Sequence, residues 1–181
     1  RRNSASPADG DLTGQLTFTN NNDAGEGTDY ATMYALSADV SNGSEDAAFY
    51  IKTMSAGTLR QRISLTDTAT VFNEDSIDLD FRVESDGDAN MLFVDGGNNR
   101  VGIGTSSPSR NLTLSSSGQT DLAIIAASGS SAQLCFGDGD DDNVGQIEYS
   151  HPTDSMRFYT QGTEQMRLDS SGNVLVGTTT S

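Results

Sequence analysis

The chain has 181 residues, of which 34% are hydrophobic, below the roughly 45–50% apolar share of ordinary globular domains, a share that also counts glycine. Its formal net charge of −16 and its pI of about 4.1 exclude a nucleic-acid-binding protein and disfavour an anionic membrane surface, because affinity for phosphate comes from Lys and Arg. The lone Cys135 excludes an intrachain disulfide framework, and no apolar run approaches the ~20 residues of a membrane span.

The first part of the chain is predicted to be a short linker followed by strands. Residues 1–11 form the N-terminal linker, and residues 12–75 form a first β-module. Residues 29–40 carry apolar residues at helical spacing, but Asn42-Gly43 precedes a second apolar run at 47–54, and Asn-Gly between two such runs is the strongest short hairpin signal. We therefore predict two strands around a turn, with a helix as the alternative.

The other apolar runs are short and bounded by turn residues, which is typical of an all-β protein with almost no helix. Several alternate apolar and polar residues, as where Phe81 and Val83 flank Arg82. A period of two places the apolar members on one face of a strand. The runs predicted as strands are 14–18, 60–65, 79–83, 90–94, 100–104, 111–114, 121–125, 133–136, 146–150, 156–160, 165–169 and 174–177.

The sequence also repeats itself. Residues 80–105 align with residues 155–178, so that Met91 matches Met166 and Gly104 matches Gly177, and residues 14–27 echo residues 132–145. A unit this small cannot bury both faces of its sheet alone. The predicted segments are a β-repeat over 76–110 with the motif MLFVDGGNNRVGIGT, a connector over 111–118, and a second β-module over 119–181 that ends in MRLDSSGNVLVGT.

We expect identical neighbouring chains to cover the face of each sheet that its own chain cannot bury. The apolar residues are few, but they come in regular clusters, which favours burial against partner chains over disorder. In VGIG, Val101 and Ile103 share one face of the expected strand, while Gly102 and Gly104 on the other face let another backbone come close. The residues predicted to form the core of a trimer are Phe81, Val83, Leu92, Val94, Val101, Ile103, Met156, Phe158, Leu168, Val174 and Val176.

The stretches MLFVDGGNNRVGIGTSSPS and MRLDSSGNVLVGTTTS resemble repeats of tail-fibre and side-fibre proteins of tailed bacteriophages, particularly marine ones, and so does the stretch over residues 20–49. The resemblance covers residues 12–181 approximately. It implies an elongated homotrimeric β fibre, exposed outside the cell on a virion and attached to other virion tail proteins. The fibre is either an intertwined triple β-helix or a stack of small β-sandwich modules. Such proteins often end in a self-cleaving chaperone domain, and its absence here makes a piece of a longer chain the expectation.

Local chemistry is sparse in this sequence. Asp138, Asp140 and Asp142 offer closely spaced oxygen ligands for Ca²⁺, but the EF-hand pattern is incomplete, so a solvated acidic loop is the stronger interpretation. His151 is expected to be a turn histidine rather than a catalytic base, and Cys135 a small strand residue rather than a reactive thiol. Candidate glycan contacts are Tyr30, Tyr34 and Tyr149, although half-buried strand positions are the commoner role of such tyrosines.

The expected function is therefore structural. The chain would be a shaft or spacer that presents a host-recognition tip, with no enzymatic activity, no cofactor beyond the Ca²⁺ considered above, and no insertion into a membrane. One alternative is an adhesin segment that binds a bacterial surface glycan directly, where many weak contacts add up by multivalency. The other is a glycan-degrading tailspike, which would use paired carboxylates.

Overall fold

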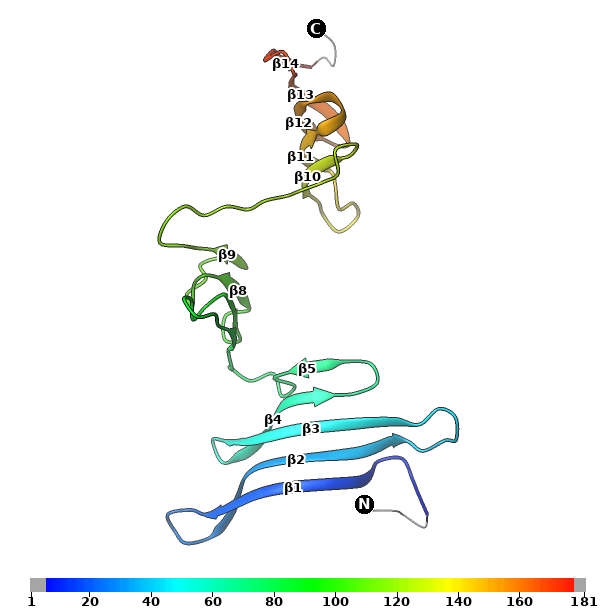
Figure 1. Ribbon diagram of the computed structural model, residues 1–181, viewed down its shortest axis with the longest axis vertical. Helices are drawn as coiled ribbons and strands as arrows, with labels where there is room; N and C mark the ends of the chain where they lie inside the picture. The colour runs from blue at the N-terminus through cyan, green and yellow to red at the C-terminus, as the bar shows by residue number, and fades with distance from the viewer. Residues whose placement is uncertain (1–5, 178–181) are drawn as a thin grey trace. The chain divides into compact units, whose positions relative to one another are not determined.

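The computed structural model describes residues 6–177, which form three β-sheets and one 3-10 turn, η1 (His151–Thr153) (Figure 1). The chain divides between Thr120 and Asp121 into two compact units. The first and second sheets belong to the first unit, and the third sheet belongs to the second unit. The all-β class predicted from the sequence is confirmed.

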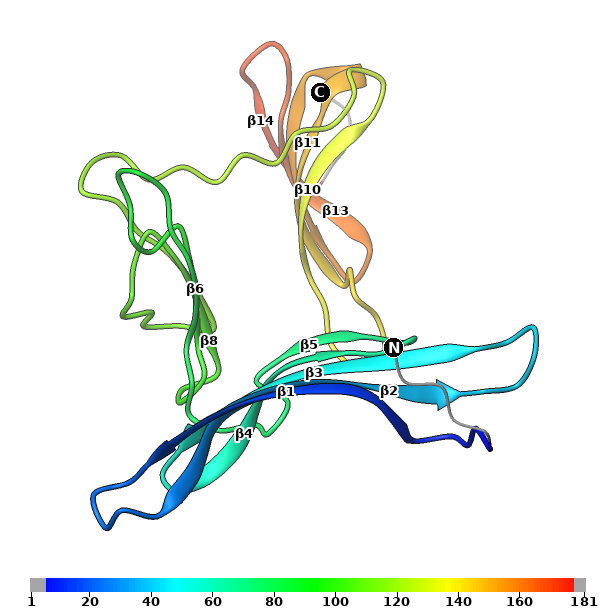
Figure 2. The same cartoon turned by 60° about the horizontal axis from the view of Figure 1, so that its bottom comes forward.

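The first sheet is an antiparallel meander in which each strand pairs with the next along the chain (Figure 2). Residues 29–39 fall in strand β2 rather than in a helix, and the predicted turn follows, where the Ser44 amide donates to the Ser41 carbonyl at 3.0 Å. Gly43 has a φ of 95°, which a side chain would disfavour. The strands are β1 (Asp11–Asn21), β2 (Gly27–Asp39), β3 (Asp46–Ser55), β4 (Thr58–Leu65) and β5 (Thr70–Phe72).

The second sheet has four short strands, and its last pair, β8 and β9, is parallel. Strand β9 lies within residues 111–118, so the predicted connector includes a strand of this sheet. The close backbone approach predicted at Gly102 and Gly104 occurs within the chain itself, since added Cβ atoms would overlap the carbonyl oxygens of Thr105 and Ser115. The strands are β6 (Phe81–Val83), β7 (Leu92–Asp95), β8 (Arg100–Ile103) and β9 (Leu112–Leu114).

The third sheet is another five-stranded antiparallel meander and has the same sequential strand order as the first. The two sheets share a two-residue turn, with φ values of 48° and 75° at Ala56-Gly57 and of 50° and 66° at Gln161-Gly162. Positive φ at both positions suits the twist of a hairpin. The strands are β10 (Ser131–Phe136), β11 (Gly145–Ser150), β12 (Ser155–Thr160), β13 (Thr163–Leu168) and β14 (Val174–Val176).

Two sequence predictions about strands were wrong. Residues 121–125 were predicted to be a strand, but they belong to none, and the Ile125 side chain is 88% exposed. Apolar composition alone does not make a strand, because the backbone needs a neighbour to accept its hydrogen bonds. Conversely, β5 was missed, since three residues between turns give too short a run for a pattern to be recognised.

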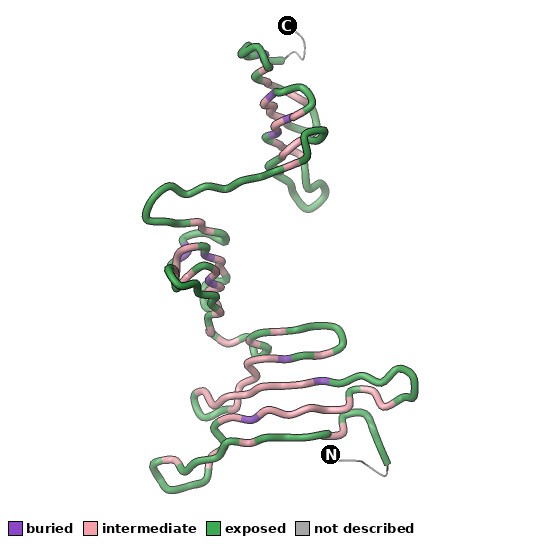
Figure 3. The backbone as a smooth tube through the Cα atoms, viewed as in Figure 1, coloured by how far each residue is buried: buried purple, intermediate pink, exposed green. Residues whose placement is uncertain are grey.

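None of the three sheets contains a closed hydrophobic core. Among the described residues, the buried hydrophobic side chains are Ala48, Phe93 and Leu175, and Figure 3 shows the buried positions scattered singly along the chain. Most strand residues are half-buried or exposed. The strands of each sheet are paired by backbone hydrogen bonds, but most of the large apolar side chains remain in contact with solvent.

Candidate functional site: apolar faces of the sheets

The third sheet has one continuous apolar face. Residues paired directly across antiparallel strands share a face, so the register identifies rows that cross all five strands. Val174 and Val176, at the edge of the sheet, are 66% and 71% exposed. None of the ten residues in the two central rows is charged: Leu134, Ile147, Phe158, Met166 and Val176 form one row, and Ala132, Tyr149, Met156, Leu168 and Val174 form the other.

The opposite face of the third sheet carries the charges. Arg157 and Arg167 are direct cross-strand partners, an arrangement of like charges that is destabilising by itself. Glu164 resolves this repulsion, because Arg167 Nη2 donates to Glu164 Oε2 at 2.6 Å and Arg157 Nε lies 3.8 Å from the same oxygen. Glu148 accepts from Arg157 at 3.5 Å and from Gln133 Nε2 at 2.6 Å.

The pKa values of Glu164 and Arg167 are shifted by this hydrogen bonding. The hydrogen bond from Arg167 lowers the pKa of Glu164, although partial burial opposes the shift. The same bond raises the pKa of the Arg167 guanidinium. Both groups therefore stay charged over the whole physiological range, and this face is a fixed ionic surface.

The second sheet repeats the division into two faces. Its apolar face has one row across all four strands, and Val83 pairs with Leu92 and Ile103 with Leu114 on the same side. The other face carries Arg82 and the enclosed Phe93, which is 7% exposed. The row that crosses the sheet consists of Phe81, Val94, Val101 and Leu112.

The first sheet has an equivalent apolar face, which the sequence analysis did not assign to an interface. Its strands showed period two, but that pattern does not identify which residues of different strands pair. The register does so: one row is Leu16, Met33, Ile51, Ile63 and Phe72, and the adjacent row is Gly14, Ala35, Phe49, Leu65 and Thr70. None of these ten residues is charged.

The eleven residues predicted as a trimer core are brought together on two of these faces. Phe81, Val83, Leu92, Val94, Val101 and Ile103 lie on the apolar face of the second sheet, and Met156, Phe158, Leu168, Val174 and Val176 lie on that of the third. Their own chain leaves them half-buried or exposed. The structure thus places them as surface residues of a single chain.

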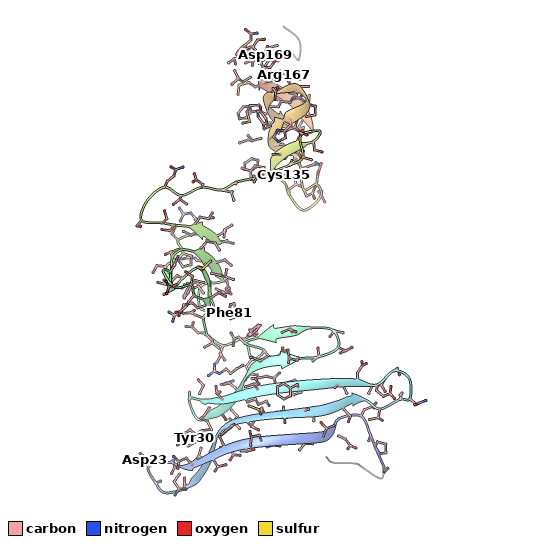
Figure 4. The ribbon with its side chains drawn as sticks, viewed as in Figure 1. Asp23, Tyr30, Phe81, Cys135, Arg167 and Asp169 are labelled. Carbon is pink, nitrogen blue, oxygen red and sulfur yellow. The ribbon has the colours of Figure 1, made fainter. Side chains whose placement is uncertain are left out.

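The three tyrosines predicted as glycan contacts lie on two different strands, Tyr30 and Tyr34 on β2 and Tyr149 on β11. Tyr30 lies near Asp23 at one end of the first sheet (Figure 4), beside a bulge in β1–β2 pairing. Tyr34 packs against Tyr50 at 5.1 Å between ring centroids, with Lys52 Nζ 5.4 Å from its ring. Tyr149 belongs to the third sheet, in the other compact unit.

A hollow that the sequence analysis did not predict lies beside Tyr30. It has a volume of about 260 Å³ and is lined by Phe18, Thr19, Asn20 and Tyr30. The Phe18 and Tyr30 side chains are 50% and 42% exposed. Tyr30 faces it because the register shifts between Phe18 and Thr19, and a bulge redirects the side chain that it leaves unpaired.

The acidic loop between β10 and β11 is built as a turn rather than as a metal site. Asp138 Oδ1 accepts from the amides of Asp140 and Asp141 at 2.9 and 3.1 Å, and these bonds lower the pKa of Asp138. The proposed ligands Asp138, Asp140 and Asp142 do not form a metal-binding group, nor do any other His, Cys, Asp or Glu residues within 6–177.

The two remaining reactive side chains are on the third sheet and its turn. His151 begins η1, and its ring meets Tyr149 edge-on at 5.1 Å, so its predicted place in a turn is confirmed. Cys135 is exposed on β10 (Figure 4). It lies on the charged face, because its pair with Gln146 is two positions along the strands from the pair Gln133–Glu148.

Matching aspartates close equivalent turns in the second and third sheets. Asp95 accepts from the Asn98 amide at 2.8 Å and from its side chain, and Asp169 accepts from the Asn173 amide at 2.9 Å and from its side chain. In each case the asparagine side chain is the main cause of a lowered aspartate pKa. These bonds fix the short connections β7–β8 and β13–β14.

Replacing Asp169 with asparagine should therefore weaken the fold in a pH-dependent way. A lowered folded-state pKa means that the charged aspartate stabilises the fold above the ordinary value of 3.8. This contribution is lost as the pH falls from 3.8 through the lowered folded value. Urea denaturation at a series of pH values should show that the difference in free energy of unfolding between the natural protein and Asp169→Asn becomes smaller below pH 3.8. A difference that does not change with pH would contradict the role of the charge.

No family model matches the chain, and no curated protein matches it significantly. Within the part of the chain that the structure describes, no helix is long and apolar enough to cross a membrane.

Proposed function

We propose that this chain is a structural shaft segment of a homotrimeric fibre, of the kind that tailed bacteriophages carry. In this proposal three parallel copies turn the apolar faces of their sheets toward a shared axis and their charged faces toward water. The segment spaces a host-recognition tip from the rest of the virion, joins other tail proteins, works outside the cell and catalyses no reaction. The resemblance of the two repeat motifs to tail-fibre repeats supports the choice of class.

One observation carries the proposal: on one face of every sheet, rows of uncharged and mostly apolar side chains are left largely uncovered by their own chain. The described residues include exposed Leu16, Phe72, Leu112, Val174 and Val176, which all lie on these faces. Monomeric soluble proteins rarely expose contiguous apolar patches beyond a few hundred Å². A further copy of the same chain offers a face of the same size and chemistry.

The charge of the chain sets a condition on this assembly. Three copies carry three times the net charge of −16, and like charges on the outer faces repel one another. The Debye length falls from about 30 Å at 0.01 M salt to about 8 Å at 0.15 M, so salt relieves this repulsion. Salt also strengthens burial of the apolar faces when the anion is sulfate or phosphate.

The mass of the chain in solution tests the proposal. Light scattering coupled to size-exclusion chromatography should give three times 19.1 kDa at physiological salt, with the fraction of this species rising as salt is raised. A single-chain mass at every salt concentration would overturn the assembly, and a mass of two chains would replace the threefold arrangement with a two-layer sandwich.

The hollow beside Tyr30 favours the adhesin alternative as a second candidate. Two exposed aromatic rings next to Thr19 and Asn20 combine a stacking surface with hydrogen-bonding groups, which is the chemistry that a neutral sugar needs. Glycan-array binding by this chain, lost in Tyr30→Ala and kept in Tyr149→Ala, would support an adhesin. An array without signal would leave the shaft as the function.

A further inference from the structure

We propose that the free edge of strand β10 is an interaction surface for residues 122–127 of another copy of this chain, which add to the third sheet as an antiparallel strand. This inference rests on the proposed trimer, but it concerns a sheet edge and a segment outside the sheets rather than the apolar faces. The segment includes most of the residues whose composition predicts a strand and which pair with no strand of their own chain.

Strand β10 is the one unprotected edge strand among the described residues. Proteins commonly blunt such edges with short strands, bulges, charges or proline, because free backbone groups invite pairing with another chain. Four of the six edge strands, β5, β6, β9 and β14, have three residues each, and the pairing of β1 has two register shifts. Strand β10 has six residues, no register shift against β11, and neither a charge nor a proline.

The register identifies the backbone groups that this edge offers. The Ser130 carbonyl accepts from the His151 amide at 3.3 Å, which continues the register of β10 with β11. Hydrogen-bonded and non-hydrogen-bonded pairs alternate along an antiparallel ladder. Ser131, Gln133 and Cys135 therefore direct their N–H and C=O groups away from β11, the one strand of this sheet that pairs with β10 in the described chain.

Residues 122–127, with the sequence LAIIAA, match this edge in length and chemistry. The segment has six uncharged residues, as β10 has, and Leu122 and Ile125 are 68% and 88% exposed. Within the described part of the chain, the backbone groups of residues 122–126 form no hydrogen bond with the protein. Pairing satisfies the backbone groups of the segment and of the edge together, which is how an extended peptide adds to a sheet.

The apolar face of the third sheet selects the register of the added strand. With Ile124 opposite Leu134, the leucine and the isoleucine at the even positions of the segment extend this face. Ala123 then lies opposite Cys135 on the charged face, together with Ile125. A slip by one residue exchanges the two sides of a strand, so it would leave one isoleucine on the apolar face instead of a leucine and an isoleucine.

The arrangement of the single chain favours another copy as the source of the segment. Residues 128–130 alone separate the segment from β10, and the Ser130 amide already donates to the Ala127 carbonyl at 2.9 Å, yet the segment lies outside the sheet. In a trimer each copy gives one segment and receives one, so the exchange closes as a ring of three. Pairing between two β10 edges would instead stop at two copies and leave residues 122–127 uncovered.

The natural Cys135 allows a direct test by disulfide formation. Residues that exchange hydrogen bonds across antiparallel strands have Cα atoms about 5.5 Å apart, within the roughly 4.4–6.8 Å typical of a disulfide. On mild oxidation with copper phenanthroline, Ala123→Cys in the full chain should link to Cys135 of another copy, giving species of two and three chains on a non-reducing denaturing gel. Ile124→Cys is the matched control, because its thiol points to the other face and should link roughly ten-fold more slowly. In denaturant the two rates should be equal.

Proline at neighbouring positions provides the second measurement. In the proposed register the Ile125 amide donates to β10, whereas the Ile124 amide points to solvent, where an edge strand tolerates proline. Combined with Ala123→Cys, Ile125→Pro should slow the linking roughly ten-fold, because a hydrogen bond to β10 is lost. Ile124→Pro should change the rate by less than about two-fold. Neither proline removes a hydrogen bond that the single chain forms.

The outcomes separate this inference from the proposed function. A particle with the mass of three chains in which Ala123→Cys links no faster than Ile124→Cys overturns the strand exchange and leaves the trimer standing. Linking within one chain, or rapid linking between Cys135 thiols in the natural protein, also overturns the exchange. A single-chain mass for the natural protein overturns both proposals. Fast linking between chains by Ala123→Cys, in a particle of three chains, supports both.

Discussion

Replacing Gly104 with alanine is expected to destabilise the second sheet by about 3 kcal/mol. Roughly 1 kcal/mol comes from the φ of 73°, which a residue with a Cβ rarely adopts, and about 2 kcal/mol from overpacking. The added Cβ would overlap the carbonyl oxygen of Ser115, whose amide donates to the Ile103 carbonyl at 2.9 Å. The clash therefore pushes β9 away from β8, because backbone cannot move aside as a flexible side chain can.

Gly177 provides the matched control for this prediction. It has a φ of 68° and donates its amide to the Gln165 carbonyl at 2.8 Å, as Gly104 does to the Asn90 carbonyl, but nothing lies within 4 Å of an added Cβ. Gly177→Ala should thus show the backbone cost of about 1 kcal/mol alone. Amide hydrogen exchange of residues 92–114 and thermal unfolding report the difference, and equal effects of the two substitutions would contradict the clash.

Glu164→Ala is expected to destabilise the third sheet by about 2 kcal/mol, because hydrogen bonds to charged groups are worth about 1.5–3 kcal/mol. The Glu164 side chain is 9% exposed and lies between Arg157 and Arg167. Its removal leaves two paired arginines facing each other across adjacent strands without the carboxylate that joins them. Glu148 remains 3.5 Å from Arg157, but among the described residues no ion pair joins it to Arg167.

An exposed ion pair in the second sheet tests whether burial sets this cost. Arg82 and Glu84 lie 2.6 Å apart, and each side chain is 51% exposed. Glu84→Ala should cost less than about 1 kcal/mol, since solvent screens such pairs. Denaturation in low and high salt should show a small, salt-sensitive loss for Glu84→Ala and a larger loss for Glu164→Ala. Equal losses would assign the effect to the charge balance of the whole chain.

The strands and their turns were largely predictable, because their signals are local. Alternation along residues 156–160 and the Asn42-Gly43 turn each act within a few residues of the chain, so backbone preference and period two reveal them. The apolar side of β8 was readable for the same reason, because Val101 and Ile103 alternate with glycines. The prediction failed for residues 121–125. Their local composition favours a strand, but they pair with no neighbouring strand.

By itself the sequence determined that the chain is all-β, that several of its strands alternate apolar and polar residues, and that its charge is strongly negative. Only the tertiary structure decided which residues form rows across a sheet, because strand pairing joins positions far apart in the chain. It decided the parallel pairing of β9, the contact of Ser115 with Gly104, and the place of Glu164 between two arginines. These features depend on non-local register, which no short pattern encodes.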